Sequence, residues 1–203
     1  HLTEQGQRVT VLTLWSGESE RDDIQKLEQI CQQVYSAPLS LYRSFLNSLI
    51  ALPSRNPLQA NYCWQPLLHN RLVELALGDN GTPSYDLVHV EHLRGVKYAL
   101  ELKSHFSRGK RVPIVWDSVD SISMLFRQAA GASKSFFGRW LTRFELGRTE
   151  RYERWLAGQF ERLLVTSQVD KEAFLSLQSS GFRDSRITVL PNGVDLDYFS
   201  QDM

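Results

Sequence analysis

Short apolar runs alternate with longer amphipathic stretches along the chain, and the two patterns predict different elements. Runs rich in branched aliphatic side chains are typical of strands that are buried on both faces of a parallel sheet. They lie at residues 9–14, 87–90, 112–117, 162–167 and 186–191, with a shorter run around Val34. Strands separated by helices predict an α/β fold with a Rossmann-like, mostly parallel sheet and helices on both faces.

Apolar residues at helical spacing predict the helices. Helices over 40–52 and 66–77 flank a loop, and further helices are expected over 95–106, 168–178 and 121–162, the last with a break at 129–135. The apolar residues that share a face are Leu41, Phe45, Leu49 and Leu52 in the first helix and Leu68, Leu72 and Leu75 in the second. Residues 15–29 form a polar segment between the first two strands.

The length of 203 residues favours one domain with a sizeable core. Ligands of open α/β sheets gather at the carboxyl ends of the strands, so the residues directly after each strand are the candidates for a site. The sequence contains no GxxxxGK, GxGxxG, HExxH or GxSxG motif that would assign a chemistry at once.

Charge and cysteine content exclude several classes of protein. The 23 basic residues balance the 23 acidic ones, which argues against a nucleic-acid partner. Cys31 and Cys63 lack CxxC spacing, so we expect two reduced thiols and no disulfide or zinc site. No apolar run approaches the roughly 20 residues that span a bilayer. The expected location is the cytoplasm, including the inner face of the membrane.

Polar residues end the strand at 87–90. Glu91 or His92 can act as a general acid or base, or can accept a hydrogen bond from a sugar hydroxyl. The alternation of a strand places His89 and Glu91 on one face and Val90 and His92 on the other. We expect His89 to be a buried histidine tied to a backbone group, whereas for Glu91 and His92 a structural role and a functional role both remain open.

Two carboxylates, Asp117 and Asp120, follow the strand at 112–117. Carboxylates at this spacing can bind a metal, but no third ligand is near in the sequence, and the spacing is equally that of helix caps. We therefore expect no metal at this position.

Residues 134–155 interleave aromatic side chains with arginines, a pattern typical of a segment that lies on an anionic membrane surface. Glu145, Glu150 and Glu153 dilute the positive charge. The following residues have the spacing of an ordinary core: Tyr152, Trp155, Leu156 and Phe160. Peripheral contact with a membrane and burial in the core are the two alternatives for this segment.

The last two strands end in capping and turn residues. Ser167 with Asp170 three residues later predicts a capping box, although Ser167 can also face a site at the strand end. Pro191 ends the last strand, and Asn192 and Gly193 tolerate positive φ values. No apolar alternation follows them, so the turn predicts the start of a hinge and not a hairpin.

Taken in order, four segments resemble the N-terminal domain of the family 4 glycosyltransferases, which have the two-domain GT-B fold. They are "YDLVHVEHLRG", "VPIVWDSVDS", "RTERYERW" with "QFERLLVTSQVDKEAF", and "ITVLPNGVDLDYF". The resemblance covers the chain from Leu2 onward, and its last segment is the most specific. It implies a GT-B N-terminal domain at 1–191 and the start of an interdomain linker at 192–203.

The resemblance implies that the full-length protein transfers a sugar, with retention of configuration, from a UDP-, GDP- or other nucleotide diphosphate sugar. The implied acceptor is a polysaccharide, a glycolipid or another lipid-linked sugar, and no cofactor is implied. In the family the donor site lies mostly in the C-terminal domain, which is the expected partner, so the chain alone is expected to be inactive. The family's first strand and its glycine-rich loop precede the segment "EQGQRVTVLT", so we expect the natural chain to begin further upstream.

The family's site residues can be placed on this sequence motif by motif. The implied acceptor-binding residues are Glu91, His92, Arg94, Asp117 and Asp120. The implied cleft and hinge residues are Ser167, Asn192, Gly193 and Asp195, with Asp195 and Phe199 anchoring the linker. Many relatives carry a histidine followed by an aspartate after the strand at 112–117. Here Val119 stands in place of the histidine and Asp120 keeps the acidic position, which leaves Asp120 and His92 as the catalytic candidates.

Two other functions fit the sequence. One is a non-catalytic binding or scaffold subunit that pairs with a separate donor domain. The other is a different GT-B enzyme, such as a nucleotide-sugar epimerase, because a fold alone does not determine function. The segments "PNGVD" and "VEHLRG" favour the transferase.

Overall fold

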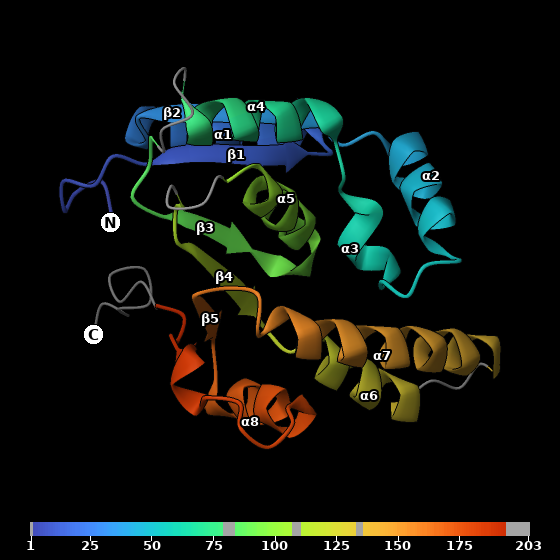
Figure 1. The fold of residues 1–203 in the computed structure, drawn as a ribbon. Helices are drawn as coiled ribbons and strands as arrows, with labels where there is room; N and C mark the ends of the chain where they lie inside the picture. Colours follow the sequence, from blue (N-terminus) through green and yellow to red (C-terminus); the bar gives the residue numbers. More distant parts are fainter. Residues whose placement is uncertain (1, 79–83, 107–110, 133–135, 194–203) are drawn as a thin grey trace, which may run out of the picture. The chain divides into compact units, whose positions relative to one another are not determined.

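The computed structural model describes residues 2–78, 84–106, 111–132 and 136–193, apart from the side chains of 131–141. The chain divides into two compact units, His1–Pro113 and Ile114–Met203. Each unit combines helices with parallel strands (Figure 1), which confirms the predicted α/β, Rossmann-like fold class. Within the described residues, no helix has both the length and the apolar character needed to cross a membrane.

The first unit begins with a parallel pair of strands. A turn over residues 2–6 ends at Gly6, which has a φ of 81°. β1 (Thr10–Trp15) then pairs with β2 (Gln33–Pro38) along its whole length.

The helix α1 (Glu18–Ile30) joins these strands where the sequence predicted only a polar segment. The pattern of apolar residues did not reveal this helix, because only Ile24 is buried and the exposed side carries ion pairs such as Arg21 with Glu18.

The rest of the first unit is mainly helical. Its elements are α2 (Leu41–Ala51), α3 (Leu58–Tyr62), α4 (Pro66–Leu77), β3 (Val88–Glu91) and α5 (His92–His105). The short helix α3 lies in the predicted loop, and α5 begins three residues earlier than predicted. The buried residues of α5 form the centre of the core: Leu93, Val96, Ala99 and Leu102. Gly95 packs so closely on β3 that a Cβ atom there would lie 2.9 Å from Cγ1 of Val90.

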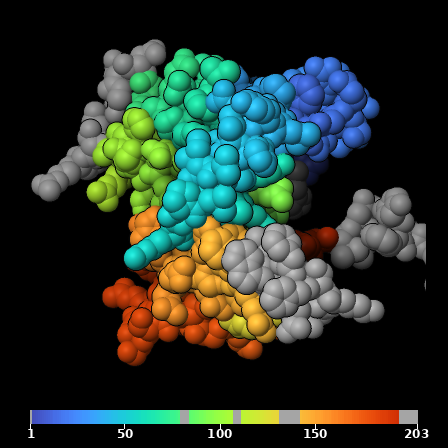
Figure 2. Space-filling view, turned by 90° about the vertical axis from the view of Figure 1, so that its right-hand side faces the viewer, coloured from blue at the N-terminus to red at the C-terminus, as the bar shows by residue number. Residues whose placement is uncertain are grey.

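The apolar face predicted for residues 40–52 is present on α2, but it is exposed to solvent. Leu41, Phe45, Leu49 and Leu52 are all exposed, and the buried residues of the helix are Ser44 and Ala51. Figure 2 shows the side chains of α2 and α3, in light blue and cyan, on the surface that faces the viewer. The periodicity therefore located the helix and its apolar face correctly, and the structure shows that this face is the outer one.

The second unit carries three parallel strands in the order β4 (Ile114–Val119), β5 (Arg162–Val165) and β6 (Ile187–Val189). Its helices are α6 (Ile122–Ala132), α7 (Phe136–Leu156), α8 (Gln168–Leu177) and the 3-10 turn Asp184–Arg186. α6 packs against α7, and α8 packs against β5 and β6. Trp116 of β4 is fully buried and contacts the rings of Phe160 and Phe174. The predicted helix break at 129–135 falls partly on residues 133–135, which lie outside the described residues.

The helix α7 packs in part in the core over residues 142–155, and contact with a membrane stays a prediction. Tyr152, Leu156 and Phe160 are buried, as their core spacing predicted, whereas Trp155 is 47% exposed and does not belong to the core. Glu153 is also buried, so it does not dilute the charge of a surface. The side chains of residues 134–141 lie outside the described residues.

Candidate functional site

The loop after β4 has a strained backbone that is held by hydrogen bonds on both sides. The pairing of β4 with β5 shifts register between Asp117 and Val119, which marks a bulge at the end of the strand. Val119 has a φ of 64°, in the left-handed region that β-branched residues rarely adopt. Its N–H donates to Oδ1 of Asp117 at 3.0 Å. Its carbonyl accepts from the N–H of Thr166 at 2.9 Å and from the Thr166 hydroxyl at 3.0 Å.

Strain of this kind persists only where neighbouring groups fix the backbone, and such positions cluster at functional sites. The same hydroxyl of Thr166 lies 3.5 Å from Oδ1 of Asp120, and the side chains of Asp117 and Asp120 are half-buried. Thr166 was not among the predicted site residues, because only its hydrogen bonds to Val119, made directly after β5, reveal its role.

The strain at Val119 predicts that an asparagine there stabilises the domain. Val119→Asn should raise the free energy of unfolding by about 1 kcal/mol, because asparagine tolerates the left-handed region whereas valine does not. Urea denaturation measures the difference. Val119→Ile keeps the β-branch and should change the stability little, so equal effects of the two variants would show that the backbone at this position is relaxed.

Asp170 connects the loops that follow β4 and β5. Ser167 caps α8 by accepting from the N–H of Asp170 at 3.1 Å, which confirms the predicted cap. The Ser167 hydroxyl also donates to Oδ2 of Asp170. Oδ1 of this buried carboxylate accepts from the N–H of Ser121 at 2.9 Å, 49 residues away in the sequence. The side chain of Ser167 is thus engaged in structure, and the cap holds the loop in which Asp120 lies.

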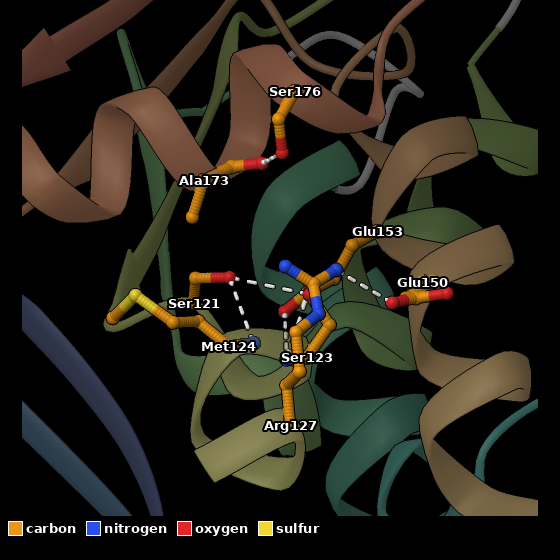
Figure 3. Close-up of polar contacts among 8 residues, drawn as sticks. All are labelled: Ser121, Ser123, Met124, Arg127, Glu150, Glu153, Ala173 and Ser176. Carbon is orange, nitrogen blue, oxygen red and sulfur yellow. Dashed lines mark hydrogen bonds and ion pairs between the residues drawn. The ribbon is translucent and has the colours of Figure 1, made fainter. Parts of the chain in front are cut away.

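A second buried carboxylate, Glu153, fixes the start of α6. Figure 3 shows its side chain extending from α7 toward the first turn of α6. Oε1 accepts from the N–H of Ile122 at 2.8 Å, and the N–H of Ser123 lies 3.3 Å from each carboxylate oxygen. Burial raises the pKa of Glu153 to about 7, since the loss of hydration outweighs the hydrogen bonds from Ser123, Ile122 and Ser121 that favour the charged form. An ion pair between Arg127 and Glu150 also links the two helices.

The predicted site residues of the first unit lie at the end of β3 and the start of α5. Glu91, His92 and Arg94 are all exposed, and His92 has a φ of 57°. This backbone conformation breaks the alternation of the strand, so His92 is exposed like Glu91 and not buried like Val90. The guanidinium of Arg94 lies over the ring of Tyr62, at 5.8 Å from its centroid.

Two expectations for histidine and cysteine have different outcomes. His89 is exposed, so the expectation of a buried histidine was wrong. Cys31 and Cys63 are both free thiols, as predicted. Burial raises the pKa of Cys63, against the opposing effect of the Arg94 charge, which makes this thiol a weak nucleophile.

The expected hinge is described only in part. Asn192 and Gly193 are exposed and have no regular secondary structure, and neither has a positive φ. A Cβ atom at Gly193 would have open space around it, so the backbone is accessible there. Asp195 and Phe199 lie outside the described residues.

The predicted residues thus form two groups. In the second unit, Asp117, Val119 and Asp120 lie beside Thr166 at the ends of β4 and β5. In the first unit, Glu91, His92 and Arg94 lie at the end of β3 and the start of α5. Across the described part of the chain, no three His, Cys, Asp or Glu side chains are grouped closely enough to hold a metal ion.

A Rossmann-like domain with polar loops at the ends of its parallel strands is the form of one half of a GT-B glycosyltransferase. Residues 1–198 match the family model described as Glycosyltransferase Family 4. The chain belongs to this family, as its N-terminal domain, and the match supports a glycosyltransferase-type function. A search of curated proteins found no match.

Proposed function

We propose that this chain is the acceptor-binding half of a retaining glycosyltransferase. The full-length enzyme moves a sugar from a UDP-, GDP- or other nucleotide diphosphate sugar to a polysaccharide, a glycolipid or another lipid-linked acceptor. The observation that carries the proposal is the strained loop at the end of β4, which holds Asp117 and Asp120 beside Thr166. In an open α/β sheet, this end of the strands is where ligands bind.

The contacts of the loop suggest different roles for its two carboxylates. Oδ1 of Asp117 accepts the N–H of Val119, so Asp117 is proposed to position the loop. Asp120 is half-buried, and its oxygen lies at the outer limit of hydrogen bonding from Thr166. An ionised carboxylate in this setting is an acceptor for a sugar hydroxyl, so Asp120 is the proposed acceptor contact.

The exposed residues at the start of α5 supply complementary chemistry. Glu91 accepts hydrogen bonds, Arg94 donates them and can bind a phosphate, and His92 can do either. Such a set suits a sugar or a phosphate-linked sugar acceptor. The donor is proposed to bind mainly to a C-terminal domain, and closure of the two domains would exclude water and align the two substrates.

An acceptor-binding role predicts a selective effect of Asp120→Asn. This variant should weaken the binding of sugar acceptors by about tenfold, since a charge-assisted hydrogen bond is lost, and should leave the thermal stability nearly unchanged. Isothermal titration of the 203-residue chain with acceptors and with nucleotide sugars measures the effect. Glu172→Gln removes a charge on the exposed side of α8 and serves as the matched control.

Transfer is tested on the full-length protein with a panel of nucleotide sugars, with the product anomer assigned by NMR. Retention of configuration supports the proposal, and inversion contradicts it. Tight binding of nucleotide sugars by the chain together with no binding of acceptors would reverse the proposed division between the domains. Acceptor binding without any transfer by the full-length protein would favour the scaffold subunit.

A further inference from the structure

The helix α2 carries its large apolar side chains on the side that faces solvent. Leu41, Tyr42, Phe45 and Ile50 are 65–74% exposed, and Leu49 is 50% exposed. The opposite side is buried and small, with Ser44 at 1% and Ala51 at 5%. An ordinary amphipathic helix of a globular protein has the reverse arrangement, with its wide apolar side facing the core.

Hydrogen bonds hold α2 in this orientation. Its packing partner is α3, and the side-chain amide of Asn47 donates to the carbonyls of Tyr62 at 3.4 Å and Trp64 at 2.9 Å. The Ser48 hydroxyl bonds back to the carbonyl of Ser44, also on the inner side. Ser40 caps the start of the helix. The polar face is therefore bound to the first unit, and the large apolar side chains of the other face are exposed.

The charge around this helix is one-sided. The chain as a whole has a formal net charge of zero, but no aspartate or glutamate occurs between Glu28 and Glu74. Arg43, on α2, and Arg55, in the loop after it, are both exposed. We define the α2 surface by its exposed apolar residues and these two arginines: Leu41, Tyr42, Arg43, Phe45, Leu49, Ile50, Leu52 and Arg55.

We propose that the α2 surface docks on an anionic lipid bilayer, with the helix lying in the plane of the interface. Apolar and aromatic side chains then enter the boundary between headgroups and acyl chains, and the arginines meet lipid phosphates. The absence of acidic residues favours lipid over a second copy of the chain, because a dimer through this surface would bring together arginines with no carboxylate to pair them. The proposed surface lies in residues 41–55, whereas the sequence pattern suggested the segment 134–155.

The test is flotation of the full chain with phosphatidylcholine vesicles that contain or lack phosphatidylglycerol. The chain should float with the anionic vesicles and much less with the neutral ones. Tyr42→Ser combined with Phe45→Ser and Leu49→Ser should lower vesicle partitioning by at least about 100-fold, since three apolar side chains no longer enter the bilayer. Removal of one arginine lowers vesicle partitioning by about fivefold. The double charge reversal Arg43→Glu with Arg55→Glu should therefore lower it by more than about 25-fold.

Matched controls use exposed residues on other elements. Leu87→Ser with Val169→Ser removes exposed apolar side chains, and Arg8→Glu with Arg183→Glu reverses two exposed charges. Both control pairs should float like the unchanged chain. Because all the test positions are exposed, circular dichroism should show the same fold for every variant.

Three results would overturn the proposal. They are failure of the unchanged chain to float with anionic vesicles, equal flotation with neutral vesicles, and undiminished flotation of the α2 variants. Self-association that the serine variant abolishes, without any vesicle binding, would instead assign the α2 surface to a second copy. Flotation requires no sugar transfer, so its outcome is independent of the proposed function.

Discussion

Glu153→Ala lowers the free energy of unfolding by roughly 3–5 kcal/mol, the largest expected effect of a single substitution outside the apolar core. The alanine leaves the N–H groups of Ile122 and Ser123 without their acceptor in a buried position and creates a cavity beside them. Glu153→Gln keeps an oxygen at nearly the same place, so its loss of stability at neutral pH should stay within about 1 kcal/mol. Urea denaturation of the three proteins measures these differences.

The pH dependence of the stability distinguishes the effect of the charge on Glu153 from the effect of its size. Burial raises the pKa of this carboxyl from the ordinary value of 4.5 to about 7 in the folded chain. Between these two pH values the folded protein keeps a proton that the unfolded chain has released, which stabilises the fold. This contribution is complete below pH 4.5 and is lost as the pH rises through 7. The free energy of unfolding then falls by up to about 3 kcal/mol. Between pH 5 and pH 8 the unchanged chain should therefore lose stability relative to the glutamine variant. A constant difference over this range would contradict the raised pKa.

Asp170→Ala is expected to cost roughly 2–4 kcal/mol of stability and to loosen the loop that contains Asp120. The carboxylate receives the N–H of Ser121 and the hydroxyl of Ser167, and both donors are left without it. Its loss therefore separates the loops after β4 and β5. Hydrogen exchange of the Ser121 amide is the specific measurement, because its protection should fall in the variant by at least about tenfold.

Two control variants distinguish the contact of Asp170 with Ser167 from its contact with Ser121. Ser167→Ala removes the cap of α8 and should cost about 1 kcal/mol while leaving the Ser121 amide protected. Asp170→Asn keeps one acceptor oxygen for the Ser121 N–H. The protection of the Ser121 amide in this variant should therefore lie between the values for Asp170→Ala and Ser167→Ala. Unchanged protection of Ser121 in Asp170→Ala would show that the carboxylate is only a helix cap.

Some features that depend on neighbouring residues were predicted correctly, and others were missed. The strands follow from branched aliphatic runs, and the cap at Ser167 follows from an aspartate three residues later. The helix α1 was missed because only Ile24 is buried and its exposed side carries ion pairs, which leaves no apolar period to read. The strand alternation failed at His92, where a single left-handed residue turns the backbone.

Features that depend on distant residues were not readable. Glu153 was interpreted as a surface charge, although it binds the start of a helix about 30 residues earlier. The periodicity of α2 showed that its apolar residues share a side, but not which side packs. The bonds of Asn47 to the carbonyls of Tyr62 and Trp64, far along the chain, help to determine that choice. The candidate site was predicted as a set of residue types, without the partner Thr166 that holds its loop.

The hydrogen bonds around Val119 make the course of the loop independent of the side chain at that position. Asp117 and Thr166 bind only its N–H and carbonyl groups, which every residue except proline provides. A residue other than valine can therefore stand here while the loop keeps the same path. The position of Asp120 depends on the main-chain contacts of residue 119 and not on its side chain.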